Sequence, residues 1–263
     1  MKKGILIVSF GTTYKDTREK NIDQLTQTVR EHFPDWNIYE AYSSDKIRAV
    51  LRKRDGFVMP GTREALLQME KDGITHAAVL PTHIIDGIEN NRMKQTIEEC
   101  RDMFVEIKTA EVLLKYEEDY VIAANIFWDC IKHRAEDCPV VLMGHGSAHI
   151  ADKSYGILEQ KLQEVSGRGI YIATVEGKDS IDITIKRLKK SGMKKGRLLL
   201  HPFMLVAGDH ARNDMAGLEN SFVAKLTEQG YQPECILKGI GEYEEIRKIY
   251  IRHLSRALEK ERE

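Results

Sequence analysis

The chain has 263 residues, of which 42% are hydrophobic and 31% charged, and its formal net charge is −1. This balance is typical of a globular protein with one large domain or two lobes, and the near-zero charge gives no bulk attraction to nucleic acid. No apolar run is long enough to cross a bilayer, and the first residues lack the pattern of a signal peptide. We therefore expect a cytoplasmic protein with neither a membrane nor a nucleic-acid partner.

The first half alternates short apolar runs with segments of helical spacing. Residues 16–33 illustrate the helical pattern, since Ile22, Leu25, Val29 and Phe33 fall on one face. By these criteria, strands are predicted at residues 4–10, 37–42, 77–81 and 105–112, and helices at residues 16–33, 45–53, 62–71, 91–104 and 119–133.

The second half continues the alternation. Strands are predicted at residues 140–143, 169–175, 197–200 and 233–237, and helices at residues 150–165, 180–191, 213–228 and 242–259. Strands that alternate with helices indicate an α/β fold with mostly parallel sheets flanked by helices.

The two halves also repeat one another. Residues 5–12 match residues 140–147, residues 37–43 match 171–177, and residues 73–81 match 193–202. A duplication explains these matches more simply than chance does. We predict two similar α/β lobes, residues 1–136 and 137–263, with an active site in the cleft between them and a final helix that can cross back onto the first lobe.

Three side chains with metal-binding chemistry follow successive predicted strands of the second half. His145 stands between two glycines after one strand, Glu176 follows the next, and His210 follows the third within Gly208-Asp209-His210. Ligands of open α/β folds bind beyond the carboxyl ends of the strands, so these residues should converge. Two imidazoles and a carboxylate suit a divalent transition metal and leave coordination positions open. Because His201 lies inside an apolar segment, we interpret it as a core residue.

The matching positions of the first half carry different chemistry. Phe10, Tyr42 and Glu89 stand where the second half has His145, Glu176 and His210. If the lobes face each other, this half offers aromatic and polar surface to a large flat molecule. His83 falls in the same predicted cleft, where a functional and a structural role are equally compatible with the sequence. Arg212 would attract an acidic substrate if it lies at the rim of the cleft.

Several common catalytic patterns are missing from the sequence. It has no GxxxxGK[ST] phosphate loop, no GxGxxG after a strand, no GxSxG elbow and no HExxH helix. We therefore expect no ATP and no nucleotide cofactor. The four cysteines form no CxxC pair, which argues against a thiolate metal site.

The sequence resembles the anaerobic cobalt chelatases of cobalamin biosynthesis, the sirohydrochlorin cobaltochelatases. The resemblance covers essentially the whole chain and includes residues 7–13, 143–146 and 174–177. It is most specific at residues 204–215, MLVAGDHARNDM. It implies a two-lobed class II chelatase fold, and the family's metal ligands fall on His145, Glu176 and His210.

The resemblance implies a lyase that inserts Co(II), as its metal substrate, into the acidic tetrapyrrole sirohydrochlorin without ATP. His145 would accept a proton from the macrocycle, and Phe10, Tyr42, His83, Glu89 and Arg212 would line the tetrapyrrole cleft. Insertion of Fe(II) or Ni(II) into the same or a related tetrapyrrole is one alternative, because these ligands do not separate the three metals. A non-catalytic tetrapyrrole or metal carrier is another. Oligomeric state stays open, a homo-oligomer included.

Overall fold

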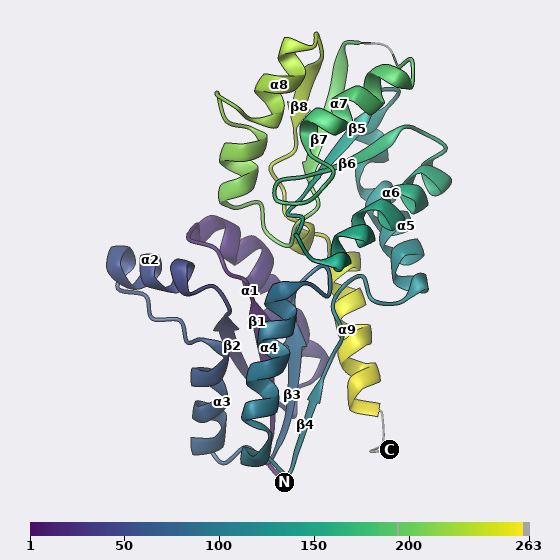
Figure 1. The fold of residues 1–263 in the computed structure, drawn as a ribbon. Coiled ribbons are helices and arrows are strands. Elements are labelled where there is room, and N and C mark those ends of the chain that lie inside the picture. Colours follow the sequence, from purple (N-terminus) through teal and green to yellow (C-terminus); the bar gives the residue numbers. More distant parts are fainter. Residues whose placement is uncertain (194, 260–263) are drawn as a thin grey trace. The chain divides into compact units, whose positions relative to one another are not determined.

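The structure is a computed structural model that describes residues 1–193 and 195–259 and divides them into two compact units (Figure 1). The first unit contains Met1–Lys115 together with the chain from Arg247 onward, and the second contains Tyr116–Ile246. Each unit has one parallel sheet of four strands with helices around it, as the alternating pattern predicts.

The first unit is built on a sheet with strand order β2-β1-β3-β4. Its central strand has a continuous apolar run, Ile5 to Val8, that is fully buried, as expected for a strand covered on both faces. Its elements are β1 (Lys3–Ser9), α1 (Lys15–His32), β2 (Asn37–Tyr42), α2 (Asp45–Asp55), α3 (Thr62–Lys71), β3 (His76–Pro81), α4 (Ile88–Glu99), β4 (Glu106–Thr109) and most of α9 (Glu244–Glu259).

The second unit has the strand order β6-β5-β7-β8, which is the order of the first unit repeated. Its central strand β5 is fully apolar and buried, like β1. Its elements are α5 (Glu117–Ala135), β5 (Val140–Gly144), α6 (Lys153–Ser166), β6 (Ile170–Thr174), α7 (Ile181–Lys190), β7 (Arg197–Pro202), α8 (Phe222–Glu228) and β8 (Gln232–Cys235). The predicted duplicated α/β fold is therefore confirmed.

The structure divides the chain at a different point from the predicted boundary between residues 136 and 137. The whole of α5 belongs to the second unit. Its Phe127 ring packs edge-to-face on His201 and Phe203, with centroid distances of 4.9 and 5.2 Å, and Tyr120 donates a hydrogen bond to Ser154 Oγ at 2.9 Å. These contacts attach α5 to β7 and α6. The pattern break at residues 137–139 is therefore a loop within the second unit.

The last helix joins the first unit, as the sequence analysis allowed. From Arg247 onward, α9 belongs to that unit. Tyr250 donates a hydrogen bond to the carbonyl of Thr82 at 2.9 Å, and Lys108 donates one to the carbonyl of Leu258 at 3.0 Å. These bonds tie the helix to the end of β3 and to β4.

The helix predicted at residues 213–228 is wrong, because the chain forms two short helical segments there. A π-helical turn covers Ala211–Met215, and α8 begins only at Phe222. Between them Asn220 has a left-handed φ of 54°, which interrupts a helix. Ser221 then caps α8 by accepting a hydrogen bond from the amide of Ala224 at 3.0 Å.

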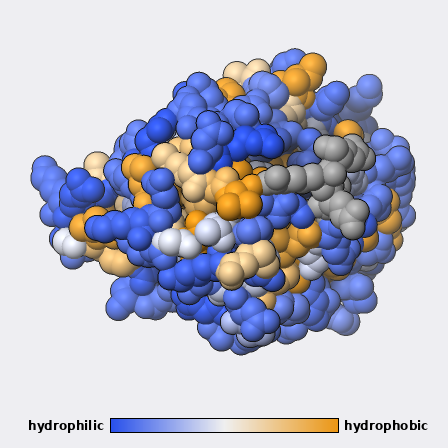
Figure 2. All heavy atoms as spheres, turned by 90° about the horizontal axis from the view of Figure 1, so that it is seen from below, coloured by the Kyte–Doolittle hydropathy of each residue, from blue (hydrophilic) through white to orange (hydrophobic). Residues whose placement is uncertain are grey.

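The surface carries the polar residues that the composition predicts. Figure 2 shows one face of the molecule, on which hydrophilic side chains cover most of the area and hydrophobic ones show between them. Within residues 1–193 and 195–259, no helix is both long and apolar enough to span a membrane.

Candidate metal centre

The end of β5 brings His145 beside Glu176. Two backbone hydrogen bonds continue the pairing of β5 and β6 past the strands themselves. The amide of Val175 donates to the carbonyl of Gly144 at 3.1 Å, and the amide of Glu176 donates to the carbonyl of His145 at 2.8 Å. His145 and Glu176 are therefore neighbours at the carboxyl edge of the second sheet, where parallel folds place their ligands.

Glycines on both sides of His145 permit this close approach. A Cβ atom at Gly146 would lie 2.3 Å from the backbone nitrogen of Gly177, and Gly146 has a φ of +80°. A Cβ atom at Gly144 would lie 2.5 Å from the ring of Tyr155. A larger residue at either position would push the His145 loop away from its neighbours.

His210 reaches the same place from the next strand. It follows β7 by a loop and directly precedes the π-helical turn Ala211–Met215, a kind of distortion that often occurs at functional sites. Its ring lies edge-to-face with that of His145, at a centroid distance of 4.9 Å and an interplanar angle of 89°. One ligand atom from each of His145, Glu176 and His210 lies within 4.8 Å of the other two.

This spacing is close to what one metal ion requires. Two donors on opposite sides of an ion, each at about 2.1 Å, are about 4.2 Å apart. Side-chain exposure is 36% for His145, 61% for Glu176 and 32% for His210, so all three have room to rotate into bonding distance. The most exposed, Glu176, has the most freedom. This is the one group of metal-ligand type found among the residues that the structure describes.

Hydrogen-bond acceptors lie beside Nδ1 of both imidazole rings. Nδ1 of His210 lies 2.7 Å from the Asp214 carboxylate, and Nδ1 of His145 lies 3.0 Å from the carbonyl of Gly146. When Nδ1 carries the proton and donates to these oxygens, Nε2 keeps its lone pair. Such an acceptor behind a ligand histidine fixes the ring and makes it more basic.

Comparison with known proteins identifies the family. Residues 3–259 match the family model described as Cobalt chelatase (CbiK). The chain belongs to the cobalt chelatase family. It is similar to sirohydrochlorin cobaltochelatase of Salmonella typhimurium, with 33% identity over 98% of this chain and 97% of that protein. Sirohydrochlorin cobaltochelatase CbiKC of Nitratidesulfovibrio vulgaris is 32% identical over 98% of this chain and 91% of its own length.

The fold of this cobalt chelatase family member is also found in a solved structure of lower identity. SirB from Bacillus subtilis with Fe3+ has a TM-score of 0.69 and 17% identity, covering 98% of this chain and 96% of that one. At this identity the likeness concerns the fold alone. The resemblance inferred from the sequence is therefore confirmed for family and fold, while the roles of individual residues stay predictions.

Tyr42 is not placed as its predicted role in the tetrapyrrole cleft requires. It is fully buried, and a Cβ atom at Gly11 would lie 2.4 Å from its ring. Its phenol oxygen has no hydrogen-bond partner among the described residues, and burial raises its pKa. Tyr42 pairs with Ser9 as Thr174 pairs with Gly144, so its counterpart is Thr174. The residue equivalent to Glu176 is Ser44, whose amide faces the carbonyl of Phe10 at 3.4 Å.

The other residues predicted for the cleft differ in exposure. Phe10 follows β1 and is 40% exposed. Glu89 lies in the first turn of α4, where it pairs with Arg92 at 2.9 Å. Arg212 is partly exposed in the π-helical turn. Both ring nitrogens of His83 are buried without a hydrogen-bond partner in the described part of the chain, and burial lowers its pKa to about 4.

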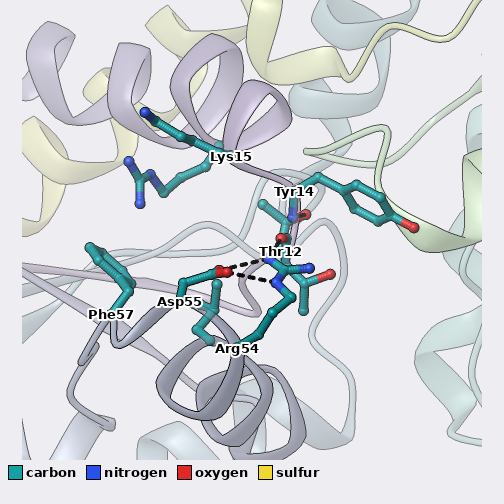
Figure 3. Close-up of a pocket in the computed structure, with 9 residues that line it drawn as sticks. Thr12, Tyr14, Lys15, Arg54, Asp55 and Phe57 are labelled. Carbon is teal, nitrogen blue, oxygen red and sulfur yellow. Dashed lines mark hydrogen bonds and ion pairs between the residues drawn. The ribbon is translucent and has the colours of Figure 1, made fainter.

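Sequence reasoning missed a pocket in the first unit, shown in Figure 3. It has a volume of about 310 Å³ and lies between the start of α1 and the end of α2. The guanidinium of Arg18 lies 4.8 Å from the centroid of the Phe57 ring, and Arg54 donates to Asp55 at 2.7 Å. The hydrogen bond from Arg54 lowers the pKa of Asp55. The lining residues are Thr12, Thr13, Tyr14, Lys15, Arg18, Leu51, Arg54, Asp55 and Phe57.

Proposed function

We propose that this cobalt chelatase inserts Co(II) into sirohydrochlorin, and that His145, Glu176 and His210 hold the metal ion before its transfer. The convergence of these three donors within 4.8 Å is the observation that carries the proposal. Two relatives that match over nearly their whole length, at 33% and 32% identity, are named sirohydrochlorin cobaltochelatases. Imidazole and carboxylate are suitable ligands for Co(II).

The half-exposed setting of the donors suits temporary binding. Three protein ligands leave coordination positions open to water or to the incoming ring nitrogens. Glu176, with 61% of its side chain exposed, can detach most easily. The Co(II) ion would thus exchange protein donors for pyrrole nitrogens one at a time, without ever losing all of its ligands.

The same imidazoles supply bases for the pyrrole protons. Insertion of a divalent ion displaces two N–H protons from the macrocycle. An Nε2 lone pair cannot bind the metal and a proton together, so proton uptake follows release of the metal. His145 is our first candidate for this proton transfer, with His210 for the second. No step of this scheme uses a phosphoryl donor, and the absence of an ATP requirement stays a prediction.

The pocket of the first unit is our candidate for a site that binds carboxylate groups. Three lining side chains are cationic, Lys15, Arg18 and Arg54, and Asp55 is the one carboxylate of the lining. Outside the lining, Asp23 pairs with Arg18 at 3.3 Å and Glu19 with Lys15 at 3.7 Å. The Lys15 side chain is 79% exposed. We expect Lys15→Ala to raise KM for sirohydrochlorin several-fold and to leave Co(II) affinity unchanged. Lys20→Ala, an exposed lysine of α1 outside the lining, is the matched control.

The test of the function is metal insertion followed by absorbance. Purified protein is given sirohydrochlorin and Co(II), Fe(II) or Ni(II) without ATP. We expect many turnovers with Co(II), at least 100-fold slower turnover in His145→Ala and His210→Ala, and no change in His133→Ala, an exposed histidine of the same unit. A single equivalent of product would indicate a carrier. Full activity of both ligand variants would refute the proposal.

The metal comparison in that assay decides among related activities. A higher kcat/KM with Fe(II) or Ni(II) would identify that ion, and not Co(II), as the metal substrate. The proposed metal ligands would stay the same. Cytoplasmic location and oligomeric state stay predictions.

A further inference from the structure

Asp152 occupies an unusual position at the start of α6 in the second unit. It is the last residue of the 3-10 helix Ile150–Asp152, which runs directly into α6 and is capped by His149, whose Nδ1 accepts from the amide of Ala151 at 3.2 Å. The Asp152 side chain makes no such capping bond. It is nevertheless 9% exposed, so its carboxylate needs other partners.

The partners are backbone amides of the two loops that carry His145 and Glu176. Oδ1 of Asp152 accepts from the amide of Ser147 at 3.0 Å, and Oδ2 accepts from the amide of Lys178 at 3.1 Å. Each donor stands two residues after a candidate metal ligand. One carboxylate therefore bridges the loop after β5 to the loop after β6.

The bridge also contacts the residue that directly follows Glu176. A Cβ atom on Gly177, the residue after Glu176, would be 2.4 Å from Oδ1 of Asp152. One on Gly146, the residue after His145, would be 2.3 Å from the nitrogen of Gly177. The Asp152 carboxylate therefore packs against Gly177, which in turn packs against Gly146. A change at Asp152 would therefore displace both of the loops that carry His145 and Glu176.

Glu159, a buried acid of α6, differs from Asp152 because its contacts stabilise the sheet. Glu159 is 7% exposed, accepts a hydrogen bond from the amide of Ile172 at 2.7 Å and pairs with Arg187. Ile172 lies in the middle of β6, away from the loop that carries Glu176. Glu159 therefore supports the sheet, whereas Asp152 supports the ligand loops.

We propose that Asp152 is a positioning residue, which holds His145 and Glu176 at the separation that one Co(II) ion requires by bridging the amides of Ser147 and Lys178. This inference rests on the proposed function. Hydrogen bonds to a charged acceptor are shorter and stronger than neutral ones, so a carboxylate fixes the two loops better than a neutral side chain would. Mutation of the groups that support metal ligands typically lowers metal affinity 10- to 100-fold.

The experiment compares Asp152→Asn, Asp152→Ala and Glu159→Gln by titration with Co(II). The visible d–d bands report the coordination geometry, and urea unfolding gives the stability of each variant. The amide of Asp152→Asn keeps the shape but can accept only one of the two amide protons. We expect Co(II) Kd to rise about tenfold in Asp152→Asn and further in Asp152→Ala, with altered bands. Glu159→Gln should stay within about twofold and keep the bands, even where it loses as much stability.

The outcomes separate this inference from the proposed function. Unchanged Co(II) affinity and bands in both Asp152 variants, alongside lost binding in His210→Ala, would overturn the positioning role and leave the metal site standing. Unchanged binding in His210→Ala itself would refute the proposed function, and with it the role of Asp152. If Asp152→Ala does not fold, the nearly isosteric Asp152→Asn decides the question alone.

Discussion

Gly146→Ala is the sharpest single test of how the backbone builds the candidate metal centre. The substitution has two separate effects. Gly146 has a φ of +80°, and a left-handed conformation costs an L residue about 1–2 kcal/mol. The added Cβ would also lie 2.3 Å from the nitrogen of Gly177, whereas ordinary contact begins at 3.4 Å. The two loops must therefore separate by about 1 Å, since the atom they collide with belongs to the backbone and cannot rotate away.

That movement is large on the scale of metal coordination. The bond from the Glu176 amide to the carbonyl of His145 is 2.8 Å long, and a stretch of about 1 Å breaks it. Metal–ligand distances tolerate only about 0.2 Å, so His145 and Glu176 can no longer bind one ion together without strain. We expect Co(II) Kd to rise at least about tenfold, as when the support of a metal ligand is lost.

Gly167→Ala provides the control. Gly167 ends α6 in the same unit with a φ of +65°, and a Cβ atom there meets nothing within 4 Å. It therefore carries the conformational strain without the collision. Gly167→Ala should lose about 1–2 kcal/mol in urea unfolding from the strain alone, and Gly146→Ala should lose more because of the added collision. Only Gly146→Ala should bind Co(II) more weakly. Equal Co(II) affinity in the two variants would refute the argument.

Three further predictions concern residues around this centre and in the cores. Asp214→Ala should raise Co(II) Kd about 10- to 100-fold, because His210 loses the acceptor that orients its ring; an unchanged titration would contradict this. Burial lowers the pKa of His201 to about 4 from the ordinary 6.5, so the unfolded chain takes up its proton first as the pH falls through this window. Because of His201, the free energy of unfolding should therefore fall by about 2 kcal/mol between pH 7 and pH 5. In His201→Phe, the difference between the unfolding free energies measured at these two pH values should be smaller by that amount. Tyr42→Phe should leave activity unchanged and raise the unfolding free energy by about 1 kcal/mol, since it removes a buried hydroxyl without a partner among the described residues; slower metal insertion would restore the predicted substrate role.

The sequence was sufficient to predict that the three candidate ligands converge, because strand direction and residue chemistry coincide there. Apolar runs identified β5, β6 and β7, and parallel strands bring their carboxyl ends to one edge. His145, Glu176 and His210 each follow one of these ends, so their convergence needs no knowledge of side-chain packing. Asp152 follows no strand, and its two amide partners are 5 and 26 residues away in sequence. No local pattern reveals such a contact.

Errors in the sequence analysis arose where strand pairing and tertiary contacts, and not residue composition, determine the structure. Aligning residues 37–43 with residues 171–177 set Tyr42 opposite Glu176, two positions from the pairing seen in the ladders. Both segments alternate in the same way, and a shift of two residues preserves which face each side chain occupies. Only the hydrogen bonds to the neighbouring strand fix the register. The boundary near residue 136 failed for a related reason, since the packing of Phe127 on β7 is a tertiary contact.

Comparison of the two units separates the contribution of the backbone from that of the side chains. Each unit has the same strand order and a glycine of positive φ two residues after its central strand, Gly11 and Gly146. Yet the three equivalent positions hold Phe10, Ser44 and Glu89 in the first unit, and a group of metal-ligand type is found only in the second among the described residues. The shared backbone therefore places three equivalent positions beyond the carboxyl edge of each sheet. Whether that edge can bind a metal is decided by two imidazoles and one carboxylate, because aromatic carbon and a hydroxyl cannot replace them as ligands of Co(II).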